Sequence, residues 1–293
     1  MTQEKGRSVK EISNLFAKGL ADRDFERISQ LVYRLAGIKL PPHKKSMVEA
    51  RLRRRLRILQ MASYEEYCSY LFSPEGEENE IVSLLNEIST NKTDFFREPA
   101  HFDLLQERIL DELAQSHGAG VDRPLRIWSA GCSSGEEPYT LAMVLSEYRR
   151  QRGDYDFSIL ATDISTKVLE AARLGIYRSE KIAPVPLNLR KSYLLRSRDS
   201  SRDQVRVGPE LRSKVEFRRV NFMDDEFGVD TGLDIIFCRN VIIYFDKPTQ
   251  VRLINHFCRH LIHGGYLFMG HSETLHGMTL PLKHVAPSVY SRI

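Results

Sequence analysis

The stretch that most constrains the fold runs from Arg126 to Leu145 and reads RIWSAGCSSGEEPYTLAMVL. It begins with strand-forming residues, Gly131 opens a turn of small residues, and an apolar run follows Pro138. This order predicts a strand, a turn and a helix. Ser134 and Glu137 have the spacing of a capping box, and Pro138 suits a first helical turn, which needs no N–H at that point. A strand that enters a helix through glycines is typical of the ligand crevice in doubly wound α/β proteins.

The residues of this turn argue against a phosphate ligand. A dinucleotide site commonly reads G-x-G-x-x-G, so that bare backbone N–H groups approach a pyrophosphate. Here Gly131 and Gly135 have no glycine between them, and Glu136 and Glu137 put negative charges where phosphates would lie. Such charges suit a cationic ligand, and S-adenosylmethionine carries a sulfonium and an ammonium group but no phosphate. The alternative, that both glutamates only stabilise the helix dipole, stays open.

Length and composition bound the class of protein. The chain has 293 residues, a length typical of about two domains, and 42% of them are hydrophobic, which allows a sizeable core. The four cysteines form no C-x-x-C pair, so we expect reduced thiols and no metal site. No apolar run is long enough to cross a bilayer, and we expect a cytoplasmic protein without membrane insertion. The net charge of +4 is small, so an acidic partner would have to meet a local basic patch.

Residues 1–90 have helical patterns and few turn glycines, and they contain a strongly basic segment, HKKSMVEARLRRRLRILQ. The apolar residues of this segment, which can pack inward together, are Val48, Leu52, Leu56 and Leu59. Glu49 is its only acidic residue, so we expect the helix to dock on an acidic surface, either nucleic acid or an acidic protein helix. The alternative is a solvated face. The expected docking residues are Arg51, Arg53, Arg54, Arg55 and Arg57. Residues 74–78 are predicted to form an acidic loop.

Residues 91–125 join the helical part to the central strand. Polar side chains crowd around Phe95 and Phe96 in this joint, namely Asn91, Thr93, Asp94 and Arg97. A simple linker would be less distinctive, so we expect a lid that contributes polar contacts to the crevice. The alternative is a capped helix start with two core aromatics.

Polar residues also follow the predicted strands beyond the central helix. Asp163 follows the strand DFSILAT, where an acidic residue can accept hydrogen bonds from ribose hydroxyls. Its alternative role is the N-cap of the next helix. The later strand-end residues are Asn221 and Phe222, then Arg239 and Asn240, with Tyr244 just beyond. The alternation of strands and helices predicts a mostly parallel sheet, with a last strand that follows a loop and can pair antiparallel.

Residues 176–214 interrupt the α/β alternation. They hold three prolines and two short strand candidates, SYLL and QVRVG, around the polar loop RSRDSSRD. We expect a β-hairpin inserted beside the main sheet. Its exposed edge could accept an extended peptide as an added strand, or the segment could be a tolerated surface loop.

Five motifs in order, TNKTDFFRE, WSAGCSSGEEPY, LATDIS, IFCRNVIIYFD and GGYLFMGHSE, resemble the CheR family of chemotaxis receptor methyltransferases. The resemblance runs from about Phe25 to the C-terminus. It implies an α/β fold: a Rossmann-like class I methyltransferase domain with an inserted β-subdomain, preceded by a small all-helical N-terminal domain. The expected divisions are 1–90 for the helical domain, 91–125 for the linker and entry helix, and 126–293 for the methyltransferase domain, with the β-subdomain at 176–214.

The resemblance also implies a reaction and its partners. The family transfers a methyl group from S-adenosylmethionine to glutamate side chains of chemoreceptors, which gives glutamate methyl esters and S-adenosylhomocysteine. The basic helix would then face the acidic receptor helices, and the β-subdomain could hold a receptor C-terminal tail. The loop RSRDSSRD lacks the glycine pair of tail-binding members.

Site residues follow from the same resemblance, position by position. The implied cofactor contacts are Asn91, Thr93, Arg97, Glu137, Asp163, Asn221, Phe222, Arg239 and Asn240. Arg97 and Tyr244 are the implied catalytic residues, near the methyl-accepting carboxylate.

Two rival functions can be weighed on sequence. A nucleic-acid methyltransferase would explain the basic helix, but enzymes that methylate exocyclic amines commonly carry N-P-P-Y or D-P-P-Y where this chain has NVIIYF. We therefore expect no nucleic-acid partner. A non-catalytic adaptor that binds cofactor or receptor is the other rival, and the intact motif positions argue against it.

Overall fold

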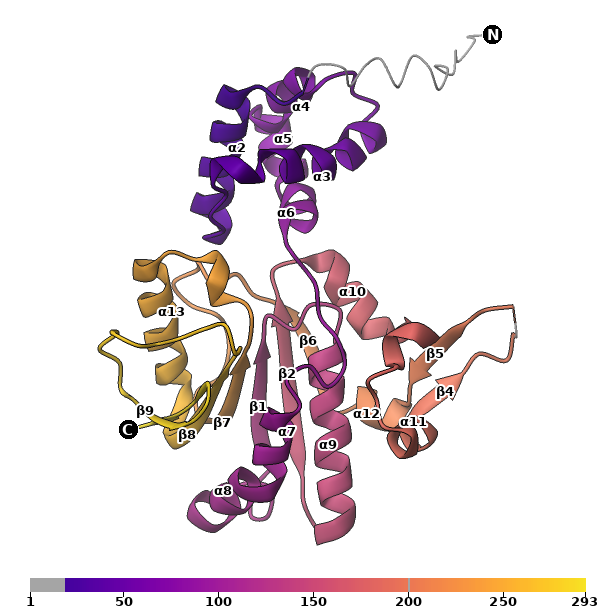
Figure 1. Cartoon of the computed structure of the whole chain (residues 1–293), viewed down its shortest axis with the longest axis vertical. Coiled ribbons are helices and arrows are strands. Elements are labelled where there is room, and N and C mark those ends of the chain that lie inside the picture. Colours follow the sequence, from indigo (N-terminus) through magenta and orange to yellow (C-terminus); the bar gives the residue numbers. More distant parts are fainter. Residues whose placement is uncertain (1–18, 200) are drawn as a thin grey trace. The chain divides into compact units, whose positions relative to one another are not determined.

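The computed structural model describes residues 19–199 and 201–293. The chain divides into two compact units, Met1–Thr90 and Asn91–Ile293, called here the N-terminal and C-terminal units. Each unit has its own elements, labelled in Figure 1. Among the described residues, no helix combines the length and apolar character needed to cross a membrane.

The N-terminal unit is built from helices. Its α-helices are α2 (Asp22–Ala36), α3 (Lys45–Ile58), α4 (Tyr64–Leu71), α5 (Pro74–Asn79) and α6 (Ile81–Ile88), with the short 3-10 helix η1 (Pro42–Lys44) before α3. The prediction of an acidic loop at 74–78 is wrong, because these residues form α5. The side chain of Ser73 accepts a hydrogen bond from the Gly76 N–H, and Pro74 occupies the first turn, where its missing N–H costs nothing.

Helix α3 carries the basic segment. Val48, Leu52 and Leu56 are fully buried, as the helical spacing predicted. Arg55 is also directed into the unit: its guanidinium donates to both carboxylate oxygens of Glu80, at 2.8 and 2.7 Å. Glu80 is 1% exposed and accepts a further hydrogen bond from the Tyr67 hydroxyl at 3.0 Å.

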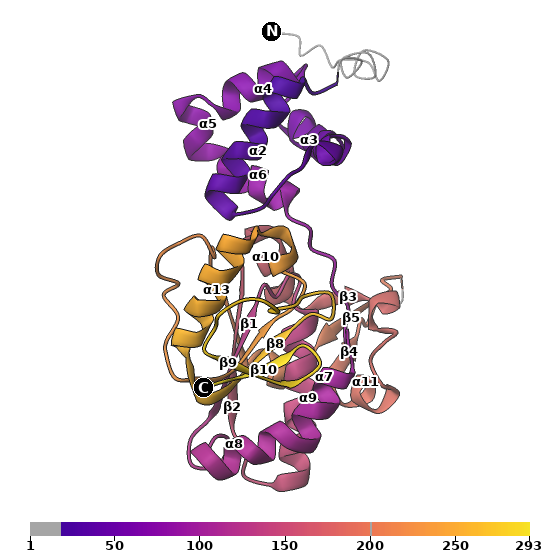
Figure 2. The same cartoon turned by 60° about the vertical axis from the view of Figure 1, so that its left-hand side comes forward.

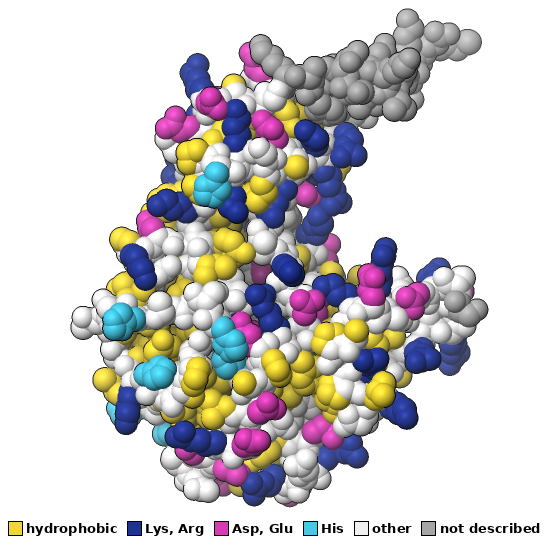
Figure 3. Space-filling view, viewed as in Figure 1, with side chains coloured by type: hydrophobic (Ala, Val, Ile, Leu, Met, Phe, Trp, Pro, Cys, Tyr) yellow, Lys and Arg dark blue, Asp and Glu magenta, His cyan; other side chains and the backbone are white. Residues whose placement is uncertain are grey.

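The other predicted docking arginines differ in their surroundings. Arg51 donates to the backbone carbonyls of Ile88 and Ser89, which lie at the end of α6. Arg54 pairs with Glu87 at 3.4 Å while its side chain stays more than half exposed. Arg53 and Arg57 are exposed. Figure 3 shows lysine and arginine side chains gathered on the part of the unit where α3 lies. Arg51 and Arg55 are thus engaged within the unit, and Arg53, Arg54 and Arg57 form its outward basic face.

The C-terminal unit contains a seven-stranded sheet with the order β6-β2-β1-β7-β8-β10-β9. Its strands are β1 (Leu125–Ala130), β2 (Phe157–Asp163), β6 (Val215–Arg219), β7 (Leu233–Cys238), β8 (Leu261–Met269), β9 (Leu282–Ala286) and β10 (Val289–Arg292). The pairs from β6 to β8 are all parallel, whereas β10 runs antiparallel to both β8 and β9. The sequence predicted one terminal strand, and the structure has a hairpin of two.

Helices cover both faces of this sheet (Figure 2). One face packs against the entry helices α7 (Ala100–Leu104), η2 (Leu105–Ile109) and α8 (Leu110–His117), and against α9 (Glu136–Arg152). The opposite face packs against α13 (Lys247–His260). The strand residues alternate accordingly: Ile127 belongs to the first core and Trp128 to the second. This three-layer arrangement matches the predicted Rossmann-like fold.

The insertion forms a separate three-stranded sheet with the order β3-β5-β4. Its strands are β3 (Ile176–Arg178), β4 (Leu194–Arg196) and β5 (Gln204–Val207), all antiparallel, with η3 (Ser179–Ile182) and α11 (Leu187–Tyr193) between β3 and β4. The predicted hairpin is β4 and β5, and β3 is the strand that the sequence did not reveal. Helix α10 (Thr166–Leu174) leads into this sheet and α12 (Pro209–Arg212) leads out of it.

Candidate active site

The candidate site lies at the carboxyl edge of the parallel strands. β2, β1, β7 and β8 are neighbours and end at Asp163, Ala130, Cys238 and Met269. Because parallel strands end at the same edge, the segments that follow them meet there. The structure therefore brings together four of the sequence motifs that lie far apart along the chain.

The turn between β1 and α9 depends on two glycines in the left-handed region. Gly131 has a φ of 89° and Gly135 a φ of 95°. A Cβ on Gly135 would also lie 2.9 Å from the Cβ of Ala172. The predicted capping box is wrong: Gly135 is the N-cap of α9, and the Ser134 hydroxyl donates to the Glu136 carboxylate at 2.7 Å instead of accepting from the helix.

The two glutamates of the turn lie in different environments. Glu136 is 1% exposed, and burial raises the pKa of its carboxyl. Glu137 accepts hydrogen bonds from the Ser129 hydroxyl at 2.7 Å and from Arg239 Nε at 2.7 Å. Of the two carboxyl groups expected at the turn, that of Glu136 is buried and that of Glu137 is already paired with a cation of the chain.

Asp163 ends β2 and is 8% exposed. Its two oxygens accept hydrogen bonds from the N–H groups of Ser133 and Ser165, each at 2.9 Å. Burial raises the pKa of this carboxyl, and the backbone donors oppose the shift. Asp163 is not the N-cap of α10: that position is taken by Ser165, whose side chain makes no capping hydrogen bond. A carboxylate has about four acceptor positions, so two bonds leave capacity for other donors.

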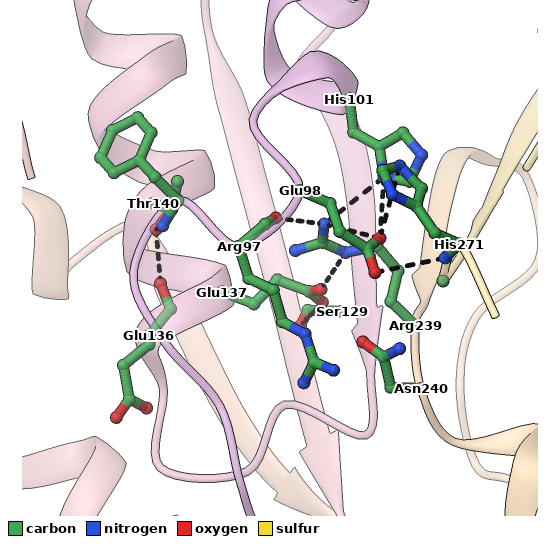
Figure 4. A network of polar contacts seen from close by, with 12 residues as sticks. Arg97, Glu98, His101, Ser129, Glu136, Glu137, Thr140, Arg239, Asn240 and His271 are labelled. Atoms are coloured by element: carbon green, nitrogen blue, oxygen red, sulfur yellow. Dashed lines mark hydrogen bonds and ion pairs between the residues drawn. The ribbon is translucent and has the colours of Figure 1, made fainter. Parts of the chain in front are cut away.

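Arg239 is the centre of a network that joins the linker to the strand edge (Figure 4). Its Nε donates to Glu137, and its Nη1 donates to the backbone carbonyl of Arg97 at 2.6 Å. Nη1 also lies 3.4 Å from His101 Nδ1 and 3.5 Å from Glu98 Oε2. Within the described part of the chain, Nη2 makes no hydrogen bond.

The cluster of Glu98, His101 and His271 borders this arginine. Each offers a possible metal-ligand atom, all within 4.8 Å of one another. His101 is 2% exposed, and burial together with Arg239 lowers its pKa to about 4, so the ring is neutral at pH 7. Since Arg239 approaches both Glu98 and His101, the cluster faces a cation that the chain itself supplies.

The linker lies along the same edge of the sheet. The Asn91 carbonyl accepts a hydrogen bond from the Ser133 hydroxyl at 3.0 Å, and the Phe96 N–H donates to Thr140 at 3.1 Å. Phe95 is buried, as its alternative reading as a core aromatic implied. Lys181 donates to the Thr93 carbonyl at 3.0 Å, so the inserted segment also holds the linker.

The remaining predicted residues lie near this edge in different environments. Arg97 directs its guanidinium away from the Glu98 cluster in Figure 4 and donates to the Lys92 carbonyl at 3.1 Å. Asn240 Oδ1 is buried and finds no hydrogen-bond partner in the part of the chain that the structure describes. Tyr244 ends the 3-10 helix η4 (Ile242–Tyr244) and is partly buried. No hydrogen bond joins Arg97 to Tyr244 within residues 19–199 and 201–293.

Asn221 and Phe222 follow the end of β6. The Asn221 side chain accepts a hydrogen bond from the Met223 N–H at 3.1 Å. The Phe222 ring packs edge-on against Trp128 and Phe257, with ring centroids 6.3 and 5.6 Å apart. Phe222 therefore extends the apolar core to the edge where the other candidate residues lie.

Sequence reasoning missed four polar residues of this edge: Glu98, His101, His271 and Glu273. Glu98, His271 and Glu273 lie inside motifs that were singled out, and His101 follows the first of them closely. Their pairing with groups more than thirty residues away gave no local signal.

Comparison with known proteins matches both units. Residues 91–290 match the model for the CheR methyltransferase SAM binding domain, and residues 23–89 match the CheR methyltransferase all-alpha domain. The chain is 41% identical to a chemotaxis protein methyltransferase of Borreliella burgdorferi, covering 92% of this chain and 94% of the relative. It is 42% identical to chemotaxis protein methyltransferase 2 of Pseudomonas aeruginosa, covering 92% of each. The corresponding protein of Escherichia coli is 40% identical, covering 87% of this chain and 85% of the relative.

Proposed function

This chain belongs to the CheR methyltransferase family, and we propose that it transfers methyl groups from S-adenosylmethionine to glutamate side chains of chemoreceptors. The products are glutamate methyl esters and S-adenosylhomocysteine. The observation that carries the proposal is the match of both units to CheR domains, one of them a SAM-binding domain. The names of the relatives, chemotaxis protein methyltransferases, favour a signalling protein as the acceptor.

The residues at the strand edge fit this methyl donor. The buried Oδ1 of Asn240 has no partner among residues 19–199 and 201–293 and can accept a hydrogen bond from an ammonium group. Arg239 Nη2 can donate to a carboxylate, and Asp163 retains acceptor capacity for ribose hydroxyls. We assign Asn91, Thr93, Glu137, Asn221 and Phe222 to the same binding site from the family motifs.

The chemistry requires little acid–base help. The bound donor supplies a methyl group whose carbon–sulfur bond breaks with its electron pair remaining on sulfur, while a carboxylate oxygen forms the new bond. A glutamate carboxylate is already ionised at pH 7, so no general base has to remove a proton. Alignment and the exclusion of water are then the main sources of rate.

Arg97 and Tyr244 are the residues that we assign to the acceptor. Among the described residues, the Arg97 guanidinium makes one hydrogen bond, to the Lys92 carbonyl, so it keeps donors for a carboxylate. The partly buried Tyr244 offers a second donor from η4. Both would position the acceptor, whereas very tight binding would reduce its nucleophilicity.

We assign receptor docking to the outward basic face of α3, formed by Arg53, Arg54 and Arg57. Three arginines on one helix face match the acidic helices that carry methyl-accepting glutamates. Arg51 and Arg55 support this face from within the unit, because both bond to groups of the N-terminal unit itself. The RSRDSSRD loop of the inserted sheet lacks the glycine pair of tail-binding members, which argues against docking of a receptor tail there.

A methyl-labelling experiment tests the function. The full chain is incubated with methyl-labelled S-adenosylmethionine and either a chemoreceptor cytoplasmic fragment or RNA. Base-labile label on the receptor fragment is the expected result. Label on RNA, or no label despite measurable cofactor binding, would contradict the proposal.

A further inference from the structure

Glu273 is a buried carboxylate that no step of the proposed reaction uses. It is 5% exposed and lies in the segment after β8. A buried charge normally has a cationic partner, but within residues 19–199 and 201–293 no lysine or arginine forms an ion pair with Glu273. Its hydrogen-bond partners are backbone N–H groups.

These N–H groups come from two segments. Oε2 accepts from Asn240 at 2.8 Å and from Gly270 at 2.7 Å, and Oε1 accepts from Ile242 at 2.8 Å. Gly270 follows β8, whereas Asn240 and Ile242 follow β7. One carboxylate therefore ties together the segments at the ends of two neighbouring parallel strands.

The backbone of Asn240 turns at the point that this carboxylate holds. Asn240 has a φ of 59°, in the left-handed region, which asparagine adopts more readily than most residues with a side chain. Gly270 makes the close approach possible: a Cβ there would lie 2.8 Å from Asn240 N and 2.9 Å from Glu273 Oε2. Glu273 accepts the Asn240 N–H at this turn of the chain.

We propose that Glu273 is a positioning residue for methyl transfer, which fixes the segment from Asn240 to Tyr244 by accepting its backbone N–H groups. The segment begins at Asn240, whose side-chain Oδ1 has no hydrogen-bond partner among the described residues, and it ends at Tyr244. One carboxylate therefore sets the position of a cofactor-side group and an acceptor-side group. This role rests on the proposed function, although the restraint itself does not.

Glu273→Gln tests the role. Glutamine keeps one acceptor oxygen but presents an NH₂ group to donors, so at least one of the three bonds is lost. We expect affinity for S-adenosylhomocysteine and the single-turnover methyl-transfer rate each to fall about tenfold or more, since hydrogen bonds to charged groups are the strong ones. Amide hydrogen exchange at Asn240 and Ile242 should accelerate in the same variant.

Asp234→Asn is the matched control. Asp234 is also fully buried, and it accepts from the Arg126 N–H at 2.8 Å and from Arg123 at 2.9 Å, but it lies near the start of β7, away from the strand end. This variant should lose stability while its affinity and transfer rate stay within about twofold of wild type. Glu273→Asp, which keeps the charge with a shorter reach, should fall between Glu273→Gln and wild type.

Three outcomes decide the inference. Selective loss in Glu273→Gln supports it. The inference is overturned if Glu273→Gln keeps the wild-type affinity for S-adenosylhomocysteine and the wild-type transfer rate. It is also overturned if affinity and rate fall equally in Glu273→Gln and Asp234→Asn, because the carboxylate would then serve stability alone. If Glu273→Gln does not fold, Glu273→Asp and Gly270→Ala replace it with the same criteria. Failure of wild-type protein to methylate a receptor fragment would reject the proposed function, while product affinity and hydrogen exchange would still decide the restraint.

Discussion

At the scale of single residues, the site is organised by Arg239. The cation bonds to Glu137 and to the Arg97 carbonyl and lies 3.4 Å from the neutral ring of His101. A lysine could not reproduce these contacts, because an ammonium group lacks the planar fork of a guanidinium. This one side chain therefore connects the linker, the turn after β1 and the end of β7.

Tyr244→Phe should slow methyl transfer about tenfold, because it removes one hydrogen-bond donor to the acceptor carboxylate. Affinity for S-adenosylhomocysteine should not change, since the ring remains. Single-turnover kinetics and calorimetry measure the two quantities, and Tyr290→Phe, in β10, is the control. An unchanged rate would remove Tyr244 from the acceptor site.

Asp163 gives a prediction for pH. Burial raises the pKa of its carboxyl, so protonation begins above the ordinary value of about 3.9 for aspartate. Affinity for S-adenosylhomocysteine should fall as pH is lowered through this raised pKa, since a protonated acid is a poorer acceptor for ribose hydroxyls. For folding the sign is opposite: the stability contribution of this group is complete below the unfolded pKa and is lost as pH rises through the folded pKa.

Calorimetric titration at several pH values measures this effect, and Asp163→Asn should bind weakly without the same pH dependence. Glu136 and Glu273 also have pKa values raised by burial, so Glu136→Gln provides the comparison. If affinity falls at low pH to the same extent in wild type and in Asp163→Asn, the pH dependence belongs to another carboxyl group.

At the scale of elements, helix α3 serves two purposes. Its inner side buries Val48, Leu52 and Leu56 and directs Arg55 to Glu80. Its outer side presents Arg53 and Arg57 to solvent. The helical spacing of the apolar residues predicted the inner apolar side. The ion pair between Arg55 and Glu80 joins residues 25 positions apart and had no local signal.

Glu80→Ala should destabilise the N-terminal unit by about 3–5 kcal/mol, because it leaves a partly buried Arg55 and the Tyr67 hydroxyl without their shared acceptor. Hydrogen exchange of the α3 and α6 backbone amides in the full chain measures this effect. Asp22→Ala is the control: Asp22 pairs with Lys45 but is almost fully exposed, so its loss should cost under about 1 kcal/mol. Equal protection of these amides from hydrogen exchange in both variants would show that the ion pair of Arg55 with Glu80 does not stabilise the unit.

The double variant Arg53→Glu, Arg57→Glu should raise the KM for a receptor fragment about tenfold, because the charge that faces an acidic helix is reversed. The KM of this variant should also depend less on salt concentration than the KM of wild type. Affinity for S-adenosylhomocysteine should stay unchanged. Arg149→Glu, an exposed charge in the last turn of α9, is the control. An unchanged KM would show that α3 does not contact the receptor.

The element boundaries show where sequence reasoning succeeds and where it fails. The strand, turn and helix around Gly131 were predicted because apolar periodicity and glycine act locally. The capping box failed because Gly135, with a φ of 95°, takes the N-cap position that Ser134 was expected to fill. The acidic segment at 74–78 became a helix because Ser73 caps it, which its charge composition did not reveal.

At the scale of the whole molecule, family motifs and alternating elements predicted the fold, including the inserted sheet. The position of the candidate site also followed, since parallel strands end at one edge. The polar contacts between the segments at this edge could not be predicted from the sequence. The ion pair of Arg239 with Glu98 and the hydrogen bond of Asn240 to Glu273 join groups that only the tertiary fold brings together. Chain order identifies the elements, and long-range polar contacts set the geometry of the site.

The proposed acceptor is a glutamate side chain of a chemoreceptor. Tandem mass spectrometry of a receptor cytoplasmic fragment, treated with this protein and S-adenosylmethionine, identifies the modified residue. The expected result is one added methyl group on identified glutamates, released as methanol by mild alkali. A methyl group on lysine or on another residue type, one that resists alkali, or a receptor that stays unmodified while a different substrate is methylated, would contradict it.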